Sequence, residues 1–448
     1  MEFNEFKTLA AAAAREAGIG DYELYYVSEE STDVSMFNGE LDSFTSALSG
    51  GAAFRCIVGG HMGSAYTQEL SESQARSLVL RAKDNALTLE KEEEAFFAEG
   101  GAVYQDYEKA DMPVLSPEAL TKAAFEANDA LKASHEKITD RCSTEAVTQR
   151  MQTSLINSRG VDLSWEASVD VVVMSAVVSD GEEMNDEYDV KAGDPAELDL
   201  KAMAEKTAGK AAAMLGAGPA PTGAYPVIFS GSAMGSLLST FASAFSAENA
   251  RKGLSALKGK EGEVIASEKV TLIDDPFYPG NPLHRNFDGE GSPAFRKEVI
   301  SGGVLNTLLY DLSTARAAGK ETTGNASRLS YDSPVSIQPY TFLLAPGELT
   351  EEELLAECGD GVWIDFLGGL HAGANPISGD FSLQSGGFLV EGGKKTRPVS
   401  SFTVSGNFFQ LLKDITALSD QVEPPRSVSL TAYVSPAVLA KGLTVSGE

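Results

Sequence analysis

The sequence has few of the side chains that bind transition metals. Among its 448 residues there are four histidines and three cysteines, and no two histidines lie within one helical turn of each other. Zinc in proteins is held by thiolate, imidazole or carboxylate groups, and the common helical motifs supply two imidazoles from one helix. Such a motif is therefore excluded. Cys56, Cys142 and Cys358 form no Cys-x-x-Cys pair, so neither a disulfide framework nor a zinc ribbon is expected.

Positive charge is scarce as well. The chain has 35 lysine and arginine residues against 65 aspartate and glutamate residues, which gives a net charge of −30. An acidic surface repels the phosphate backbone of nucleic acids, so we expect no direct nucleic-acid binding. The sequence begins with Glu2 and Glu5 where an export signal needs basic residues, and the sparse cysteines suit a reducing compartment. Both features predict a cytoplasmic location.

One uncharged stretch, residues 211–247, is long enough to cross a membrane. Prolines at 219, 221 and 226, together with several glycines, divide it into shorter segments. We therefore expect a strand at 224–229 and a short helix at 233–246 that is covered on nearly all sides, and no membrane segment.

Three common catalytic signatures are absent. The chain contains no Gly-x-Ser-x-Gly, no Gly-x-Gly-x-x-Gly and no complete P-loop motif, which argues against a serine hydrolase elbow, a dinucleotide site and a nucleotide-phosphate loop. The carboxyl pairs Asp274–Asp275 and Asp288 with Glu290 are candidates for acid–base chemistry. Aspartates flanked by proline and glycine also form turns and solvated surface, and that alternative stays open.

The order of helical and strand patterns predicts an α+β fold, with N-terminal antiparallel-sheet-plus-helix units followed by a β-rich C-terminal domain. A chain of this length holds two or three domains. We place an N-terminal α/β unit at residues 1–112, a central helix-hairpin-helix unit at 113–222 and the β-rich domain at 223–448. A charged connector at 90–112 and a linker at 216–223 mark the boundaries.

Local signals place the elements of the first two units. We expect a helix at 4–17, a hairpin about Asn38-Gly39, turns at 49–51 and 59–60, and a helix from Ser71 to about residue 89. In the second unit Ser116-Pro117 opens a helix, residues 157–160 turn a long hairpin, and Asp194 caps a helix to about residue 215. Beyond it, turns at 301–303, 346–347 and 391–393 separate short strands.

Glycine and small polar residues crowd the segment from 368 to 401. Glycines let the backbone approach a ligand closely, and His371, Asn375, Ser378 and Asp380 bring hydrogen-bonding groups to the same short stretch. An ordinary surface loop has a similar composition, so composition alone leaves both interpretations open.

The order of residues in this segment carries more information than its composition. Asn-Pro-Ile-Ser-Gly-Asp-Phe-Ser at 375–382, followed by a Gly-Gly turn and Arg-Pro-Val at 397–399, resembles the C-terminal signature of the TldD/PmbA family. The blocks at 288–305 and 322–326 resemble central blocks of that family in the same order. The resemblance extends from about residue 157 to residue 415, and more weakly over the first part.

The resemblance implies a division of labour between two related subunits. A TldD-type subunit carries His-Glu-x-x-x-His and a later Cys that bind zinc, whereas the PmbA (TldE) type lacks them. This chain resembles the second type, since Ser239, Thr240 and Ala244 stand where His, Glu and His would stand, and no Cys follows residue 418. The resemblance implies no cofactor in this chain, zinc on a TldD-like partner, and hydrolysis of unfolded peptides in a chamber that the heterodimer encloses.

Five polar residues in the family-like blocks are candidates for positioning a substrate in that chamber: His371, Asn375, Asp380, Asn325 and His284. Several alternatives remain. His284, His371 and Asp380 are a possible metal set drawn from distant loops, Asn325 is a possible structural residue, and Arg285 either binds a peptide carboxylate or pairs with Asp288. Trp165 and Trp363 are expected in the core.

Two other functions remain open at this point. A homodimer that binds peptides or a protein without cleaving them, as a regulator of the gyrase-modulator kind, is the main alternative. An independent metal-free hydrolase is the third, although no nucleophile and base pair is visible in the sequence.

Overall fold

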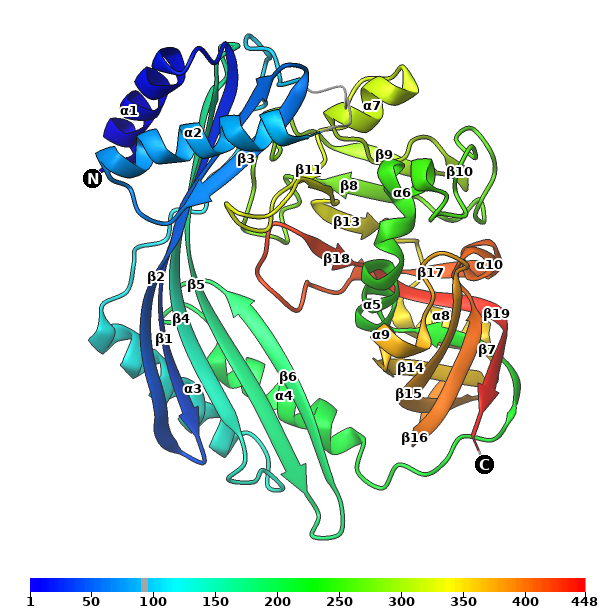
Figure 1. Cartoon of the computed structure of the whole chain (residues 1–448). Helices are drawn as coiled ribbons and strands as arrows, with labels where there is room; N and C mark the ends of the chain where they lie inside the picture. The colour runs from blue at the N-terminus through cyan, green and yellow to red at the C-terminus, as the bar shows by residue number, and fades with distance from the viewer. Residues whose placement is uncertain (90–95, 448) are drawn as a thin grey trace.

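The computed structural model describes residues 1–89 and 96–447, so the start of the expected connector, residues 90–95, lies outside the described residues. Figure 1 shows a long twisted sheet with its helices on one side of the molecule and a β-rich half on the other. The structure confirms the α+β class and the β-rich C-terminal region.

The first half is built twice from the same order of elements, helix, three strands and helix. These elements are α1 (Phe3–Glu16), β1 (Asp21–Phe37), β2 (Glu40–Val58), β3 (His61–Thr67), α2 (Glu72–Thr88), α3 (Pro117–Ala133), β4 (Ser143–Asn157), β5 (Asp162–Ser179), β6 (Met184–Ala192) and α4 (Leu200–Ala213). All six strands join one sheet in the order β3-β2-β1-β4-β5-β6. The first strand of each set is central, and the division at residue 112 stays a prediction.

Several local signals form the structures they predict. Asn38 and Gly39 both have positive φ (52° and 79°), as a two-residue hairpin turn between β1 and β2 requires. The Ser71 side chain accepts a hydrogen bond from the Gln74 N–H at the start of α2. Ser116 caps α3 in the same way, with Pro117 in the first turn.

Two expectations about boundaries were wrong. Residues 49–51 form no turn, because β2 continues through them in register with β1. Gly50 is needed there for close approach, since a Cβ would lie 2.3 Å from the Val27 carbonyl oxygen. The helix α4 begins at Leu200 and is capped by Asp199, whereas the Asp194 carboxylate accepts from the Ala196 N–H in a preceding turn.

The long sheet is covered by helices on one face only. Leu24 and Phe54 pack under α1 and α2, and Val172 and Met174 pack under α3 and α4. The register places all four residues on the same face, because side chains alternate along each strand. Part of the opposite face packs against the C-terminal half through Trp165, Phe287 and their neighbours.

The C-terminal half contains three sheets. Its strands are β7 (Gly223–Phe229), β8 (Leu272–Asp275), β9 (Lys297–Ser301), β10 (Val304–Leu305), β11 (Ala326–Ser327), β12 (Ser336–Ile337), β13 (Thr341–Leu344), β14 (Gly361–Gly368), β15 (Asp380–Glu391), β16 (Lys394–Asn407), β17 (Ile415–Val422), β18 (Ala432–Val434) and β19 (Pro436–Ser446). The sheet orders are β16-β15-β14-β7-β19-β17, β10-β9-β8-β13-β18 and β11-β12.

Short helices lie between these sheets. They are α5 (Gly231–Phe241), the 3-10 turn η1 (Ala242–Phe245), α6 (Ala247–Lys252), α7 (Leu312–Ala318), α8 (Glu351–Cys358), α9 (Leu370–Gly373) and α10 (Phe408–Asp414). As the sequence predicts, Met234, Leu237, Leu238 and Phe241 of α5 are buried in the main core, with Phe245 of η1. The central place of α5 in Figure 1 explains why this segment carries no charge.

Because helices cover only one face of the sheet, two residues of β2 should differ in how much they contribute to stability. Phe54 is fully buried and Leu48 is 78% exposed. We expect Phe54→Ala to lower the free energy of unfolding by about 3–5 kcal/mol and Leu48→Ala by less than about 0.5 kcal/mol. Urea unfolding followed by circular dichroism measures both. Equal losses in the two variants would contradict this description of the covered face.

Candidate functional site

The helix α5 and the turn η1 present the three positions that the family resemblance assigns to zinc ligands. Ser239 is exposed, the Thr240 hydroxyl donates to the Ser236 carbonyl at 2.8 Å, and Ala244 is fully buried. Two hydroxyls and a methyl group do not fit a zinc ion. Within residues 1–89 and 96–447 there is also no group of three His, Cys, Asp or Glu side chains placed to hold a metal.

The glycine-rich segment packs directly against this helix. The Phe241 ring of α5 stacks on Phe408 with centroids 4.5 Å apart, and Phe381 of β15 lies 6.3 Å away. Phe381 follows Asp380, and Phe408 begins α10. The packing therefore joins two segments that are about 140 residues apart in the sequence, and it fixes the loop before β15 beside α5.

The loop before β15 is held by its own side chains. The Asn375 side-chain oxygen accepts from the backbone N–H groups of Ile377 and Ser378, at 3.0 and 3.3 Å. The Asp380 carboxylate accepts from the Asn407 side chain at 2.8 Å, and hydrogen bonds from Asn407 and Ser378 lower its pKa. Asn375 and Asp380 therefore shape the loop.

His371 differs from these two residues. It lies on the short helix α9 with its side chain exposed. It is the member of the predicted set that can meet a ligand without breaking a loop contact.

Asn325 and His284 lie elsewhere in the C-terminal half. Asn325 is 1% exposed and donates to the Asp274 carboxylate at 2.7 Å and to the Gln338 carbonyl at 2.9 Å. The ring nitrogens of His284 face the carbonyl oxygens of Glu108 (3.2 Å) and Tyr278 (3.0 Å).

The structure thus brings His371, Asn375 and Asp380 together and leaves Asn325 and His284 apart from them. In the described part of the chain no hydrogen bond joins the two groups. The contacts favour the structural interpretation of Asn325. They also occupy both His284 nitrogens, so a metal set of His284, His371 and Asp380 does not form.

Arg285 is buried without the ion pair that the sequence left as one alternative. Its guanidinium lies over the rings of Trp165 (5.8 Å) and Phe287 (5.6 Å) and is 6% exposed. Among the described residues, no carboxylate forms a salt bridge with it, and its Nε atom has no hydrogen-bond partner. Aromatic faces therefore supply most of its direct contacts.

A set of buried charges joins the long sheet to the C-terminal half. Glu23 of β1 accepts two hydrogen bonds from Arg55 of β2, both at 3.0 Å, and a further one from Arg328. Burial tends to raise the pKa of Glu23, but the guanidinium groups of Arg328 and Arg55 outweigh it and hold the pKa below its usual value. Glu23 and Arg328 are 305 residues apart, and no sequence pattern predicts their pairing.

Asp288 and Glu290, which the sequence offered as an acid–base pair, lie beside this set and are buried. Burial raises the pKa of Glu290 to about 7, against the lowering effect of Arg55. Burial also raises the pKa of Asp288 to about 6, although its carboxylate accepts backbone N–H groups of Glu290, Ser292 and Ala326. Both carboxyls are shielded from water, and the Glu290 carboxylate accepts a hydrogen bond from the Leu312 N–H at 3.0 Å.

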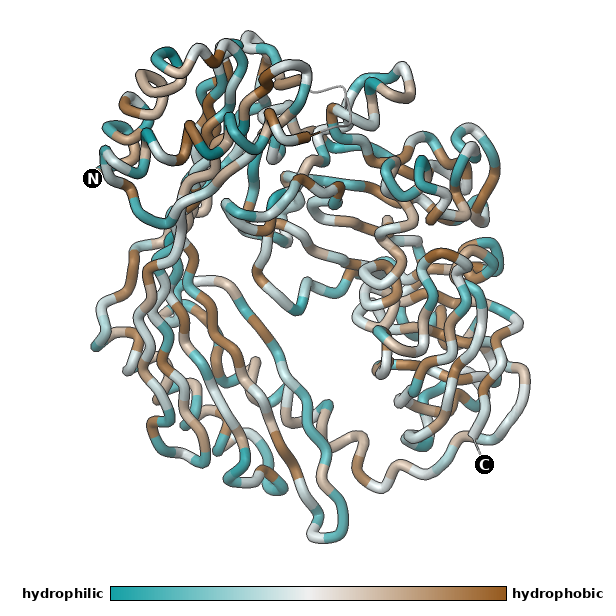
Figure 2. Tube along the Cα trace, in the orientation of Figure 1, coloured by the Kyte–Doolittle hydropathy of each residue, from teal (hydrophilic) through white to brown (hydrophobic). Residues whose placement is uncertain are grey.

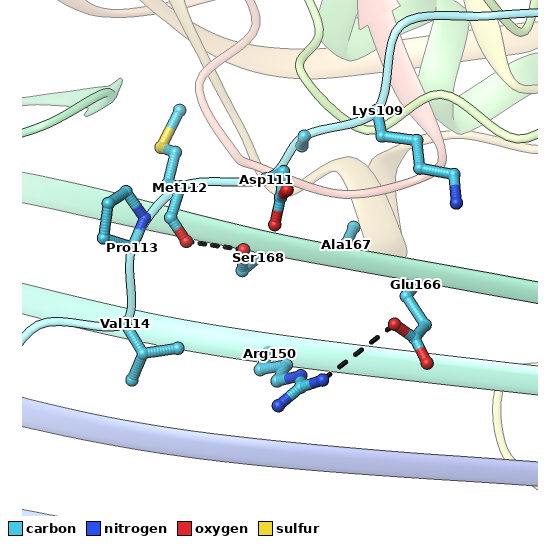
Figure 3. A pocket seen from close by; sticks show the side chains of 10 residues that line it. Lys109, Asp111, Met112, Pro113, Val114, Arg150, Glu166, Ala167 and Ser168 are labelled. Atoms are coloured by element: carbon cyan, nitrogen blue, oxygen red, sulfur yellow. Dashed lines mark hydrogen bonds and ion pairs between the residues drawn. The ribbon is translucent and has the colours of Figure 1, made fainter.

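A cavity of about 350 Å³ is lined by residues of the first half, 109–114, Arg150 and 166–168, and not by α5 or the glycine-rich loop. As Figure 3 shows, its walls come from the connector at 109–114 and from β4 and β5, with Arg150 and Glu166 paired at 3.9 Å. Ser168 donates to the Met112 carbonyl at 2.6 Å and ties the connector to β5. No residue of α5 or of the 368–401 segment lines this cavity.

Comparison with known proteins assigns the chain to a class. Models of the PmbA/TldA metallopeptidase match it in three successive regions: domain 1 at residues 22–86, the central domain at 111–215 and the C-terminal domain at 222–447. The chain belongs to the PmbA/TldD family. The resemblance read from residues 288–399 is confirmed.

Individual relatives agree with this assignment. A Haemophilus influenzae protein named metalloprotease PmbA homolog is 24% identical over 94% of this chain and 92% of its own. A solved structure from Thermotoga maritima, described as a modulator of a DNA gyrase, is 30% identical with a TM-score of 0.88 over 99% of this chain and all of that one. TldE from Thermococcus kodakarensis shares the fold, with a TM-score of 0.89 at 22% identity over 98% of this chain and 99% of that one.

None of the described helices combines the length and apolar character that a membrane span needs. The uncharged stretch at 211–247 instead supplies α5 and β7 to the interior.

The buried carboxyl of Glu290 predicts a pH dependence of stability. A carboxyl whose pKa is higher in the folded state stabilises the fold fully below its unfolded pKa, near 4.5, and loses that contribution as the pH rises through about 7. Glu290→Gln is neutral at every pH. Relative to wild type, we expect the free energy of unfolding of this variant to increase by on the order of 3 kcal/mol between about pH 5 and about pH 8. Its melting temperature should rise relative to wild type over the same range.

Differential scanning fluorimetry across that range measures the effect. The exposed Glu263 is the matched control, and Glu263→Gln should follow wild type at each pH. A wild-type protein that gains stability over Glu290→Gln on going to alkaline pH would show that Arg55, rather than burial, dominates this carboxyl.

Proposed function

We propose that this chain is the metal-free, PmbA/TldE-like subunit of a cytoplasmic TldD/PmbA-type metallopeptidase. It closes a chamber in which a zinc-bearing, TldD-like partner hydrolyses unfolded peptides. The partner's metal-bound water attacks the peptide carbonyl, and this chain positions the substrate.

One observation carries the proposal. The helix that resembles the metal-binding helix of the zinc-bearing relatives offers Ser239, Thr240 and Ala244 in place of ligands, and Ala244 is fully buried. The names of the relatives support metallopeptidase chemistry for the family. A subunit that keeps the fold and lacks the ligands therefore needs a partner for that chemistry.

The first experiment separates the chain from its partner. The purified chain should contain less than about a tenth of an equivalent of zinc and should not cleave an unfolded casein peptide. Mixing it with a His-Glu-x-x-x-His sibling from the same genome should produce cleavage, and a chelator should abolish it. Cleavage by the chain alone in the presence of the chelator would refute the proposal.

A second experiment tests substrate positioning. Four of the five predicted positioning residues make side-chain hydrogen bonds within the protein, whereas His371 is exposed, so His371→Ala should leave the melting temperature unchanged. In the mixed complex we expect kcat/KM to fall about tenfold, the equivalent of one lost hydrogen bond. His135→Ala, remote from the loop in sequence, is the control and should retain full activity.

A second function has one observation in its favour. The Thermotoga maritima relative is described as a modulator of a DNA gyrase, which favours a homodimeric binding module that holds peptides or a protein without cleaving them. The net charge of −30 makes direct binding of DNA unfavourable in that case. A stable self-dimer, together with no cleavage in any mixture with a zinc-bearing sibling, would support this function over the first.

A further inference from the structure

The face of the long sheet opposite its helices is uncovered over much of its length. In β1, β4 and β5 the side chains alternate between fully buried and partly exposed, as at Val34, Ser35, Ala146 and Val147. Buried positions face α3 and α4. Figure 1 shows these helices on one side of the lower sheet and the C-terminal half beyond the other side.

Glu23 and Arg55 project to this uncovered face by register and pair at the joint between the halves; in the part of the face beyond them the charges have one sign. Glu29 and Asp33 of β1, Glu145 of β4 and Asp186 of β6 share that part of the face by register. Across the described stretches 29–35, 43–49, 143–149, 171–179 and 184–192, no lysine, arginine or histidine of the sheet projects to the same side. Burial, and then the negative charge of Asp33, raise the pKa of Glu145.

Apolar side chains lie between these carboxylates. Val147, Val173, Val177 and Tyr188 project to the same face. Figure 2 shows hydrophobic and hydrophilic segments following one another along the long strands. A face with both kinds of group suits a ligand that is extended and carries alternating apolar and charged residues.

The protein's own loop between β17 and β18 already binds part of this face in that manner. The Arg426 guanidinium lies 3.9 Å from the centre of the Tyr188 ring, which projects to this face. Arg426 also pairs with Glu187, a residue of the edge strand β6 that register places opposite Ala176 on the helix-covered side. Val428 and Leu430, two and four residues further on, pack against the same hydrophobic cluster as Val173 and Val190. The segment thus presents a cation and two apolar groups at every second residue.

The same loop connects the face to α5. Arg426 reaches the Ser232 hydroxyl at 3.5 Å, and the Glu423 carboxylate accepts from the Ser232 N–H at 3.1 Å. A chain that continued across the sheet from the position of Arg426 would next meet Glu145 on β4, and then Asp33 and Glu29 on β1.

We propose that the uncovered face of the β1–β6 sheet binds extended segments of unfolded peptides that carry lysine or arginine, so that this chain selects cationic substrates. The inference rests on the proposed function for its substrate but concerns a separate surface. The carboxylates of the face accelerate the capture of cationic peptides and disfavour acidic ones, while the apolar side chains of the face supply contact area.

The experiment uses the full chain alone and three dye-labelled twelve-residue peptides that share their valine and leucine residues and carry Lys, Gln or Glu at every fourth position. Fluorescence anisotropy gives each Kd. We expect the Lys peptide to bind at least about tenfold more tightly than the Gln peptide, and its affinity to fall as salt screens the charges. The Glu peptide should not bind measurably.

Two variants with equal charge locate the binding. Glu29→Gln, Asp33→Asn, Glu145→Gln and Asp186→Asn together should weaken Lys-peptide binding about tenfold, toward that of the Gln peptide. The matched control replaces four exposed glutamates outside the sheet, Glu268, Glu348, Glu352 and Glu357, with Gln and should retain wild-type affinity. Both variants should melt as wild type does.

Equal Kd values for the Lys and Gln peptides, or equal loss in the two variants, would overturn the inference. Its failure is distinct from that of the proposed function. Partner-dependent cleavage with no preference for Lys peptides would retain the function and reject the acidic face. A preference for Lys peptides without any cleavage in the mixture would retain the acidic face as a binding surface and reject the proposed function.

Discussion

The contact of Glu23 with Arg55 and Arg328 is the constraint on which the arrangement of the two halves depends. Its three charged groups come from β1, β2 and the loop after β11; Glu23 and Arg328 are shielded from water, and the Arg55 side chain is 14% exposed. Burying charges is costly, and an ion pair of this kind adds little net stability over apolar packing. Removing one partner leaves an uncompensated buried charge, so the pair favours one docking of the sheet over others. The orientation of the uncovered face toward α5 follows from that docking.

The position of α5 in this chain is set by apolar packing. Its apolar side packs into the main core through Phe241 and Leu237, and this packing needs no metal. Beside this packing, α5 also carries the Ser239 and Thr240 hydroxyl groups, at positions that the family resemblance assigns to zinc ligands. The core therefore holds the helix in place whatever side chains stand at positions 239 and 240. The Phe241 and Phe408 stack keeps the glycine-rich loop beside it.

Much of the local structure was readable from short patterns. The Asn38-Gly39 hairpin and the Ser71 and Ser116 caps are fixed by residues within one turn of each other, so a linear sequence contains all the information they need. The errors arose where a distant strand decides the outcome. Gly50 looked like a turn residue, and it lies in a strand because β1 continues to pair with β2 at this point, with Ser28 opposite Gly50. The motif at 375–382 located a loop near α5, yet Asn375 and Asp380 proved to use their side chains within it.

By itself the sequence determined the family, the absence of a paired-histidine helix, the acidity of the surface and the burial of the uncharged segment. These properties depend on composition and on neighbours in the chain. The tertiary structure alone decided that Glu23 meets Arg328 across 305 residues, that Glu290 is enclosed, and that one face of the sheet stays open beside the loop of Arg426. Such contacts depend on how layers dock, and the docking is set by packing and charge pairing over the whole molecule.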